Sequence, residues 1–435
     1  MQSLSILHLI SNSWWTGTAD PVLTLVRGLL DSGQRVVLGA PAGSQVERLA
    51  QELGIPLLQG LQLDRRFHPW SWLQDLKRLR SFLRQTPIDV LHTHLSHDHW
   101  LSLCARSLPN GRETRPWVHV RTVHTLRGRA SLSTRWLLWR RSDHLITVSN
   151  ALQRRLVQEF RVPADRISLI PGVVDGERFH PGIDGSRIRQ EFELVRSTPL
   201  VGIVARIAPS RGHLTLVEAF ARVRTALPTA RLLIVGKGEF RPRVEQRVRE
   251  LGLTDAVIFA GYREEDLPEV LAAVDLFVLL APGSEGSCRA ALEAMAMGKP
   301  VVAGRVGALA DIVLDGETGL LVDVHSPADL AQAICMLILA PEDARHMGLR
   351  ARQRVEAHFS RERQVQDVLA LYHRLCTTLS DRPKLDSRIS SPLEGIGARL
   401  SRKPLSQEPM PLPPSEGEVF SNPSPLEGEG QDGGG

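Results

Sequence analysis

Short apolar segments alternate with helical patterns along the chain, and this alternation restricts the possible folds more than any other feature of the sequence. Six segments with the length of buried strands come first, at residues 6–10, 35–41, 89–94, 117–124, 143–149 and 167–171. Six more follow, at residues 200–206, 231–236, 257–261, 276–281, 300–304 and 319–323. Strands that alternate with helices form parallel, doubly wound sheets. The sequence therefore predicts an α/β protein with two such sheets facing across a cleft.

Composition divides the 435-residue chain further. Residues 1–180 are expected to form a Rossmann-like domain, residues 181–198 a linker, and residues 199–358 a second Rossmann-like domain. Residues 359–379 carry apolar side chains at helical spacing and should close the fold as a helix. Residues 380–435 are rich in proline, glycine and serine, with Phe420 as the only aromatic residue. Such a tail cannot bury a core, so we expect it to be disordered.

Bulk composition also restricts the cell compartment and the partners. The four cysteines form no Cys-x-x-Cys pair, so neither a disulfide framework nor a zinc site is expected. No apolar run has the length of a leader or of a membrane span, which predicts a cytoplasmic protein. Residues 60–161 hold eighteen Lys or Arg against seven Asp or Glu. This half should face an anionic partner, and the inner face of the cytoplasmic membrane is one candidate.

The stretch from Glu285 to Glu293 concentrates the polar chemistry of the second half. It follows the apolar run 276–281, and Ser287 can cap a helix that Gly298 and Pro300 would end. A helix that starts at the end of a buried strand offers free N–H groups and a positive dipole end to a diphosphate. The two carboxylates are then better suited to accept hydrogen bonds from the hydroxyl groups of a sugar and a ribose.

The loop after the first strand holds candidate ligand-binding residues in both halves: two arginines in the second half and one glycine in the first. Arg206 and Arg211 come directly after the strand at 200–206, and two guanidinium groups there can neutralise a diphosphate. Gly17 lies in the loop after the strand at 6–10, where it would let the backbone approach a ligand. An ordinary solvated loop is the alternative at both places.

Histidines gather at the strand ends of the first half. Four of them resemble a metal cluster, but Asp98 is the only carboxylate among them, so no metal is expected; the four are His92, His94, His97 and His99. His94 is a candidate on the acceptor side. His124 ends the next strand, where it could donate a hydrogen bond to a sugar oxygen or to a reacting hydroxyl. A structural histidine is the alternative for His124.

Two segments, residues 77–84 and 135–141, mix basic with apolar or aromatic side chains. Interfacial membrane surfaces have this composition. An amphipathic helix that packs on its own sheet has it as well, and both interpretations stay open.

With these residues together, the chain resembles the retaining GT-B glycosyltransferases of group 1, also called family 4, over residues 5–375. The most specific likeness is the Glu-x7-Glu element formed by Glu285 and Glu293. Resemblance implies that Glu285 contacts the donor sugar and Glu293 the ribose, with Gly286, Ser287 and Cys288 beside the donor. It also implies that Arg206 and Arg211 bind the diphosphate, and that His124 in Thr-Val-His-Thr contacts the sugar.

The resemblance implies transfer of a sugar from a nucleotide diphosphate sugar to a hydroxyl acceptor, with retention and without a metal or cofactor. We expect the nucleotide on the second half and a lipid-linked or phosphorylated acceptor on the first, such as the lipopolysaccharide core or another envelope glycan. No nucleic-acid partner is expected. Two departures from the family pattern are Arg211 in place of a lysine and a glycine-poor loop around Gly17. A nucleotide-sugar epimerase and an inactive sugar-nucleotide-binding subunit remain the alternatives.

Overall fold

The computed structural model describes residues 3–13, 19–63, 68–107, 117–126, 142–281 and 288–380. Gly17, Glu285, Gly286 and Ser287 lie outside these residues, as do the tail from residue 381 onward and the segment 135–141.

The first sheet has six parallel strands in the order β2-β1-β3-β4-β5-β6. Its strands are β1 (Ser5–Leu9), β2 (Arg35–Gly39), β3 (Val90–Thr93), β4 (Val118–Val123), β5 (His144–Thr147) and β6 (Ile167–Leu169). Its described helices are α1 (Ala19–Asp31), α2 (Gln45–Glu52), α3 (Pro69–Gln85), α4 (Ser96–Ser107) and α6 (Asn150–Gln158). We call residues 3–172 together with α15 (Arg361–Ser380) the N lobe.

The second sheet also has six parallel strands, in the order β12-β11-β10-β7-β8-β9. Its strands are β7 (Leu200–Val204), β8 (Arg231–Val235), β9 (Val257–Gly261), β10 (Leu276–Leu279), β11 (Val301–Gly304) and β12 (Leu320–Val322). We call residues 178–359 the C lobe; its helices are α7 (Ser186–Glu191), α8 (His213–Ala226), α9 (Arg241–Glu250), α10 (Leu267–Ala273), α11 (Arg289–Ala296), α12 (Leu309–Ile312), α13 (Pro327–Leu339) and α14 (Pro341–His358). All twelve expected strands are therefore confirmed, within a few residues at their ends.

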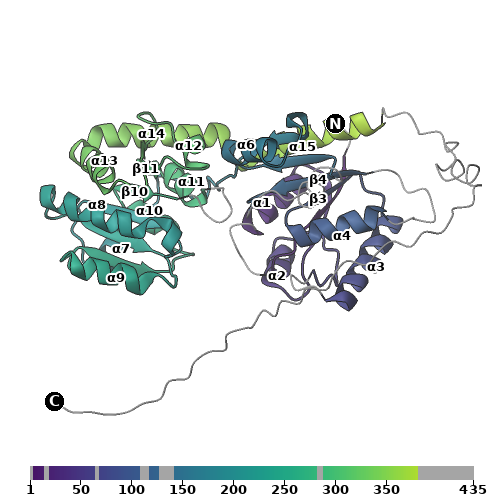
Figure 1. The fold of residues 1–435 in the computed structure, drawn as a ribbon, viewed down its shortest axis with the longest axis horizontal. Helices are drawn as coiled ribbons and strands as arrows, with labels where there is room; N and C mark the ends of the chain where they lie inside the picture. The colour runs from purple at the N-terminus through teal and green to yellow at the C-terminus, as the bar shows by residue number, and fades with distance from the viewer. Residues whose placement is uncertain are drawn as a thin grey trace, which may run out of the picture. The chain divides into compact units, whose positions relative to one another are not determined.

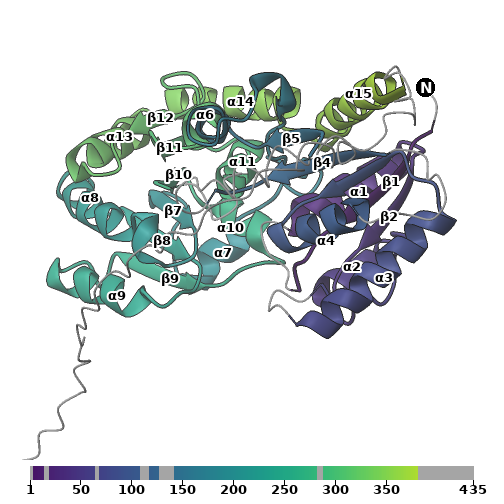
Figure 2. The ribbon, with the colours of Figure 1, turned by 45° about the vertical axis from the view of Figure 1, so that its right-hand side comes forward.

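Side chains of the N-lobe strands alternate between two buried layers, as the pleat requires. Leu7, Leu9 and Leu91 pack with α3 and α4. Ile6, Val90 and other residues of the opposite face pack with α1 and α15, and Figures 1 and 2 show α15 returning to this lobe. Because β1 and β3 are in register at Ile6 and Val90, His8 and His92 lie side by side on the same face.

Helices α1 and α15 meet at Gly28, where a Cβ atom would stand 2.5 Å from Cγ2 of Val365. We expect Gly28→Ala to destabilise the fold by about 1 kcal/mol, because overpacking of about 1–3 kcal/mol exceeds the helix propensity gained. Urea unfolding measures this change. In a Val365→Ala background the contact is gone, so the same substitution should be neutral or stabilising. Equal destabilisation in both backgrounds would contradict the packing explanation.

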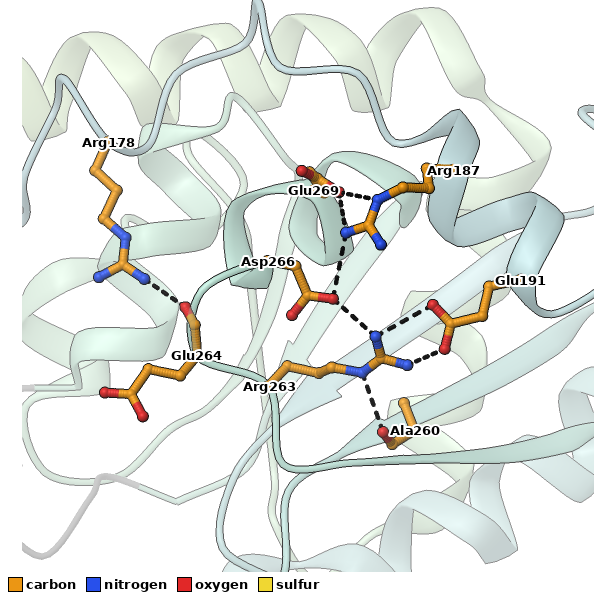
Figure 3. A network of polar contacts seen from close by, with 8 residues as sticks. All are labelled: Arg178, Arg187, Glu191, Ala260, Arg263, Glu264, Asp266 and Glu269. Atoms are coloured by element: carbon orange, nitrogen blue, oxygen red, sulfur yellow. Dashed lines mark hydrogen bonds and ion pairs between the residues drawn. The ribbon is translucent and has the colours of Figure 1, made fainter.

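The segment that joins the two sheets is bound to the C lobe (Figure 3). Arg187 pairs with Glu269, Arg263 pairs with both Glu191 and Asp266, and the guanidinium of Arg178 donates to the carbonyl of Glu264. Ion pairs at or near the protein surface stabilise by about 0–1 kcal/mol each. The apolar contact is the stronger one, because Ile188 of α7 is buried against the C-lobe core. Residues 181–198, expected as a linker, thus include a short helix that packs on this lobe.

Helix α11 begins at Arg289, one residue later than a cap at Ser287 would place it. Cys288 occupies the cap position, in the left-handed conformation with φ 52° and without a side-chain cap hydrogen bond, so the expected cap at Ser287 is wrong. The C-terminal end of α11 lies where the sequence predicted it, because Gly298 follows the helix with φ 69°. Among the described helices, none is both long and apolar enough to cross a bilayer.

Candidate active site

Arg206 and Arg211, the two arginines expected to bind a diphosphate, both follow β7 at the carboxyl edge of the C-lobe sheet. Arg206 is exposed, and its Nη2 lies 2.9 Å from Oε2 of Glu239. Arg211 ends a 3₁₀ turn, Pro209–Arg211, and Gly212 follows it with φ 77°. A Cβ atom at Gly212 would also stand 2.8 Å from the side chain of Leu280, so this turn requires glycine.

A pocket of about 470 Å³ opens beside Arg206, at the carboxyl ends of β7, β8 and β9. The ammonium of Lys237 lies 4.8 Å from the centre of the Tyr262 ring, and the Tyr262 hydroxyl donates to Glu264 at 3.1 Å. The lining residues are Val204, Ala205, Arg206, Val235, Gly236, Lys237, Gly238, Glu239, Tyr262 and Arg263. Lys237, Tyr262 and Arg263 were not singled out from the sequence. The only signal for them is the short Gly236-Lys237-Gly238 motif after a strand.

Glu293 is buried in α11 and paired along the helix. Its Oε1 lies 2.6 Å from Nε of Arg289. Nη1 of the same guanidinium lies 2.6 Å from Oδ2 of Asp20, at the start of α1. Burial raises the pKa of Glu293, and the charge of Arg289 opposes that shift. Arg289 therefore connects Glu293 to the N lobe, through a contact with Asp20 that could not be predicted from the sequence.

The histidines divide between the two faces of the N-lobe sheet, so His92 and His94 lie apart from His99 although the sequence resembles a single cluster. His92 and His94 lie with His8, and Nδ1 of His8 is 3.0 Å from Nε2 of His94. His99 lies on the opposite face, with its ring 4.9 Å from that of His119. Consecutive strand residues point to opposite faces, and α4 follows β3 after a turn, so residues close in sequence separate here.

Ring nitrogens of His8, His92 and His94 lie within 4.8 Å of one another, as metal ligands would. His92 already uses both nitrogens, at 2.6 Å from the Tyr372 hydroxyl and at 2.7 Å from the Thr122 hydroxyl. None of the charges that perturb the three rings is a carboxylate. A histidine ligand of zinc usually has a carboxylate or carbonyl behind it to support its charge. The three rings therefore lack the supporting carboxylate typical of a histidine metal site, and one of them has no free nitrogen for a metal ion.

His124 follows β4 on the same face as this cluster, with its ring 5.8 Å from that of His94. Burial, with a smaller effect from the charge of Arg121, lowers the pKa of His124 to about 4. The ring is thus neutral at pH 7 and can donate one hydrogen bond and accept another. Its Nε2 is buried without a hydrogen-bond partner.

Asp98 and Arg121 are both buried on the opposite face and interact electrostatically, which the sequence did not indicate. Asp98 accepts hydrogen bonds from the backbone N–H groups of Leu95 and Ser11, at 2.9 and 3.2 Å. Burial raises the pKa of Asp98 to about 7 and lowers the pKa of Arg121 to about 10. By binding the backbone at Ser11, Asp98 fixes the exit of β1 toward the loop that contains Gly17.

Two family models match the chain. "Glycosyl transferases group 1" matches residues 184–354, and "Glycosyltransferase Family 4" matches residues 15–178. A D-inositol 3-phosphate glycosyltransferase of Corynebacterium jeikeium is 31% identical over 66% of this chain and 72% of its own length. Its counterpart in Nocardia farcinica is 35% identical over 63% of this chain, and the match spans only 64% of that relative.

The fold has close counterparts among solved structures. Anabaena Alr3699/HepE in complex with UDP and glucose superposes with a TM-score of 0.70 at 21% identity, over 85% of this chain and 100% of that one. Two parallel six-stranded α/β sheets in series, two matching family models and a relative covered over most of its length lead to one conclusion. The chain belongs to the group 1 glycosyltransferases, also called family 4, and has the GT-B fold.

Proposed function

We propose that this chain transfers a sugar from a nucleotide diphosphate sugar to an acceptor hydroxyl, with retention at the anomeric carbon and without a metal ion. The pocket of about 470 Å³ at the ends of β7, β8 and β9 carries this proposal. Ligands of open α/β sheets bind at the carboxyl ends of the strands, and this pocket combines an aromatic face with three cationic side chains. The UDP in the Alr3699/HepE complex supports a nucleotide donor.

In this proposal the nucleobase stacks on Tyr262, whose ring is 56% exposed beside Lys237. The diphosphate binds Arg206 and Arg211, and Arg206 exchanges its partner Glu239 for a phosphate oxygen. Glu293 accepts hydrogen bonds from the ribose hydroxyls once its oxygen exchanges Arg289 for them. Guanidinium groups supply the charge that a divalent cation would otherwise supply, so the proposal needs no metal.

Retention is proposed to occur by attack on the same face from which the leaving group departs. The acceptor oxygen forms a bond to the anomeric carbon while the bond from that carbon to the phosphate oxygen breaks. The acceptor proton passes to the leaving phosphate, so no side chain has to act as the base. Glu285 and His124 then bind sugar hydroxyls. A neutral His124 suits this role, because its low pKa makes it a poor proton acceptor at pH 7.

For the acceptor, we propose a compound that carries a phosphate group and binds on the basic N lobe. The inositol 3-phosphate in the names of the two relatives supports a phosphate-bearing acceptor. Neither relative is named for lipopolysaccharide, so this proposal favours a phosphorylated polyol or a lipid-linked glycan over the lipopolysaccharide core. The same phosphate preference agrees with the excess of Lys and Arg at residues 60–161.

Incubating the full chain with UDP-, GDP- and ADP-sugars tests the proposal. A true donor raises the melting temperature by mass action, and product analysis with and without acceptor identifies the reaction. Sugar transfer only with acceptor supports the proposal. Epimerised nucleotide sugar without acceptor would identify an epimerase, and donor binding without any turnover would identify an inactive binding subunit.

Tyr262→Ala is expected to weaken binding of the nucleotide by about tenfold, because stacking of a base on an aromatic ring contributes about 1–3 kcal/mol. Tyr262→Phe is the matched control, since it keeps the aromatic face and removes only the hydroxyl that bonds Glu264. Isothermal titration with the nucleoside diphosphate measures both variants. Unchanged affinity in Tyr262→Ala would place the base elsewhere.

We also propose that α3 contacts an anionic membrane surface. Trp70, Leu73, Lys77 and Arg84 are all exposed and lie on one side of this helix, with Trp70 80% exposed. Basic side chains near such a surface contribute about 1 kcal/mol each, so changing both Lys77 and Arg84 to Gln should weaken binding about 30-fold. Co-sedimentation with phosphatidylglycerol vesicles measures this effect, and Arg222→Gln on α8 is the control. Equal binding by the double variant would exclude α3 as the contact.

A further inference from the structure

The N-lobe face that carries His94 and His124 contains a small cavity of about 30 Å³, with a mainly apolar lining to which Gln364 of α15 also contributes. Three polar atoms of the residues that line it are buried without a hydrogen-bond partner in the described part of the chain: Nδ1 of His94, Nε2 of His124 and Oε1 of Gln364. An unpaired buried polar atom costs about 1–3 kcal/mol. A polar cavity large enough for a water molecule, with two to four polar atoms around it, is where proteins hold ordered water.

We infer that ordered water in this cavity joins His94 and Gln364 to His124 and holds His124 in the tautomer that carries its proton on Nδ1. The water and the tautomer follow from the N lobe alone. The consequence for turnover rests on the proposed sugar transfer, in which His124 contacts the sugar. His94 and Gln364 then act as positioning residues, because they reach the substrate only through His124.

We call the water and the three side chains that it joins, His94, Gln364 and His124, the relay. The Gln364 amide determines the direction of one hydrogen bond of this relay. Its Nε2 lies 3.3 Å from the carbonyl oxygen of Pro171, which can only accept a hydrogen bond. The amide is therefore oriented with Nε2 as the donor to Pro171, and Oε1 is left toward the cavity as a pure acceptor. One proton of the water must point to Gln364.

The pair formed by His8 and His94 fixes the other end. Both rings are neutral at pH 7, because burial lowers the pKa of each far below its usual range. One proton is shared between Nδ1 of His8 and Nε2 of His94, which are 3.0 Å apart. If His94 carried it, Nε2 of His8 would be a buried N–H group without an acceptor. Unpaired buried N–H groups are rarer than unpaired acceptors, so His8 carries it and His94 presents Nδ1–H to the water.

Among the buried lining atoms that have no partner in the described residues, the second proton of the water then has one acceptor, Nε2 of His124. The ring centres of His94 and His124 are 5.8 Å apart, a separation that one bridging water can span. Because His124 is neutral, an acceptor at Nε2 leaves its proton on Nδ1. The relay thus determines which nitrogen of His124 is the donor available to a sugar hydroxyl.

Nitrogen-15 NMR of the full chain labelled at histidine tests the inference without any turnover. The His124 signals are assigned by their loss in His124→Gln. We expect the Nδ1–H tautomer in the wild type and a mixture of tautomers in Gln364→Met, which removes the acceptor at similar volume. Tyr372→Phe is the matched control on the same helix, because it removes a buried hydroxyl that bonds His92 outside the relay; its His124 tautomer should match the wild type.

Kinetics and a crystal structure complete the test. Loss of the relay should lower kcat about tenfold with the donor KM unchanged, the effect of one water-mediated hydrogen bond. His94→Leu should show this loss, and His94→Asn, which keeps a polar atom near the Nδ1 position, should recover part of it. An unchanged tautomer in Gln364→Met, a wild-type Nε2–H tautomer, or a crystal structure with a metal ion among these rings would overturn the inference. If no nucleotide sugar is turned over, the proposed function fails, while the NMR result still decides the relay.

Discussion

Arg206→Ala is expected to lower kcat for sugar transfer by about 100- to 1,000-fold, the usual effect of removing one preorganised donor to a developing oxyanion. In the proposed reaction negative charge builds on the leaving diphosphate in the transition state, and Arg206 is an exposed guanidinium group that lines the proposed donor pocket. The side chain is 67% exposed and pairs with Glu239, which is 61% exposed, so the substitution should change stability by about 1 kcal/mol or less. Steady-state kinetics and thermal unfolding of the purified variant measure the two effects.

Two further variants make this result specific. Arg222→Ala, on the exposed side of α8, removes the same charge away from the pocket and should leave kcat unchanged. Glu239→Gln removes the competing partner of Arg206 while keeping the guanidinium, so activity should persist. Transfer by Arg206→Ala at more than half of the wild-type rate would show that this arginine does not stabilise the leaving group.

Through the four clustered histidines and Asp98 together, acidification from pH 7.5 to pH 5.5 is expected to destabilise the N lobe by about 3.5 kcal/mol. Burial lowers the pKa of His8 to about 3 and that of His124 to about 4, and it lowers the pKa of His92 and His94 well below the usual value. The folded state therefore resists protonation that the unfolded chain accepts near pH 6.5. The stabilisation is complete above pH 6.5 and is lost as the pH falls, by about 1.4 kcal/mol for each ring at pH 5.5.

Asp98 acts in the opposite direction. Its pKa is raised to about 7, so the folded state binds this proton more tightly than the unfolded chain does. Protonation of Asp98 between pH 7.5 and pH 5.5 stabilises the fold by about 2 kcal/mol and offsets part of the histidine effect. Asp98→Asn should consequently make the loss of stability on acidification steeper.

Urea unfolding at several pH values measures this dependence. His8→Leu removes one buried ring and should reduce the loss between pH 7.5 and pH 5.5 by about 1.4 kcal/mol. His325→Leu, at an exposed position after β12, is the control and should leave the dependence unchanged. Stability that is independent of pH over this range in the wild type would show that the histidine cluster is accessible to protons in the folded state.

The sequence predicted the positions of all twelve strands and the closing helix, because both depend on local periodicity. A strand of four to six apolar residues between helical patterns is recognisable without knowing its neighbours. It also predicted that Arg206 and Arg211 stand at the carboxyl edge of the second sheet, since residues that follow a strand lie at its carboxyl end. The predicted cap of α11, Ser287, lies one residue before the observed cap, Cys288. The left-handed backbone conformation of Cys288, rather than the capping preference of a side chain, sets that boundary.

What the sequence could not predict involves residues that are distant along the chain. Tyr372 bonds His92 across 280 residues, and Arg289 pairs with Asp20 across 269. His8 meets His94 because β1 and β3 are neighbours in the sheet, although 86 residues separate them.

The sequence by itself thus determined the element order and the motif residues, since periodicity and spacing are local properties. Only the tertiary structure decided which histidines share a face, that Glu293 is paired with Arg289, and that Gln364 meets His94 and His124 at one cavity. The physical reason is that strand order, register and the return of α15 set these contacts, and each of them is fixed by packing over the whole lobe rather than by the residues nearby.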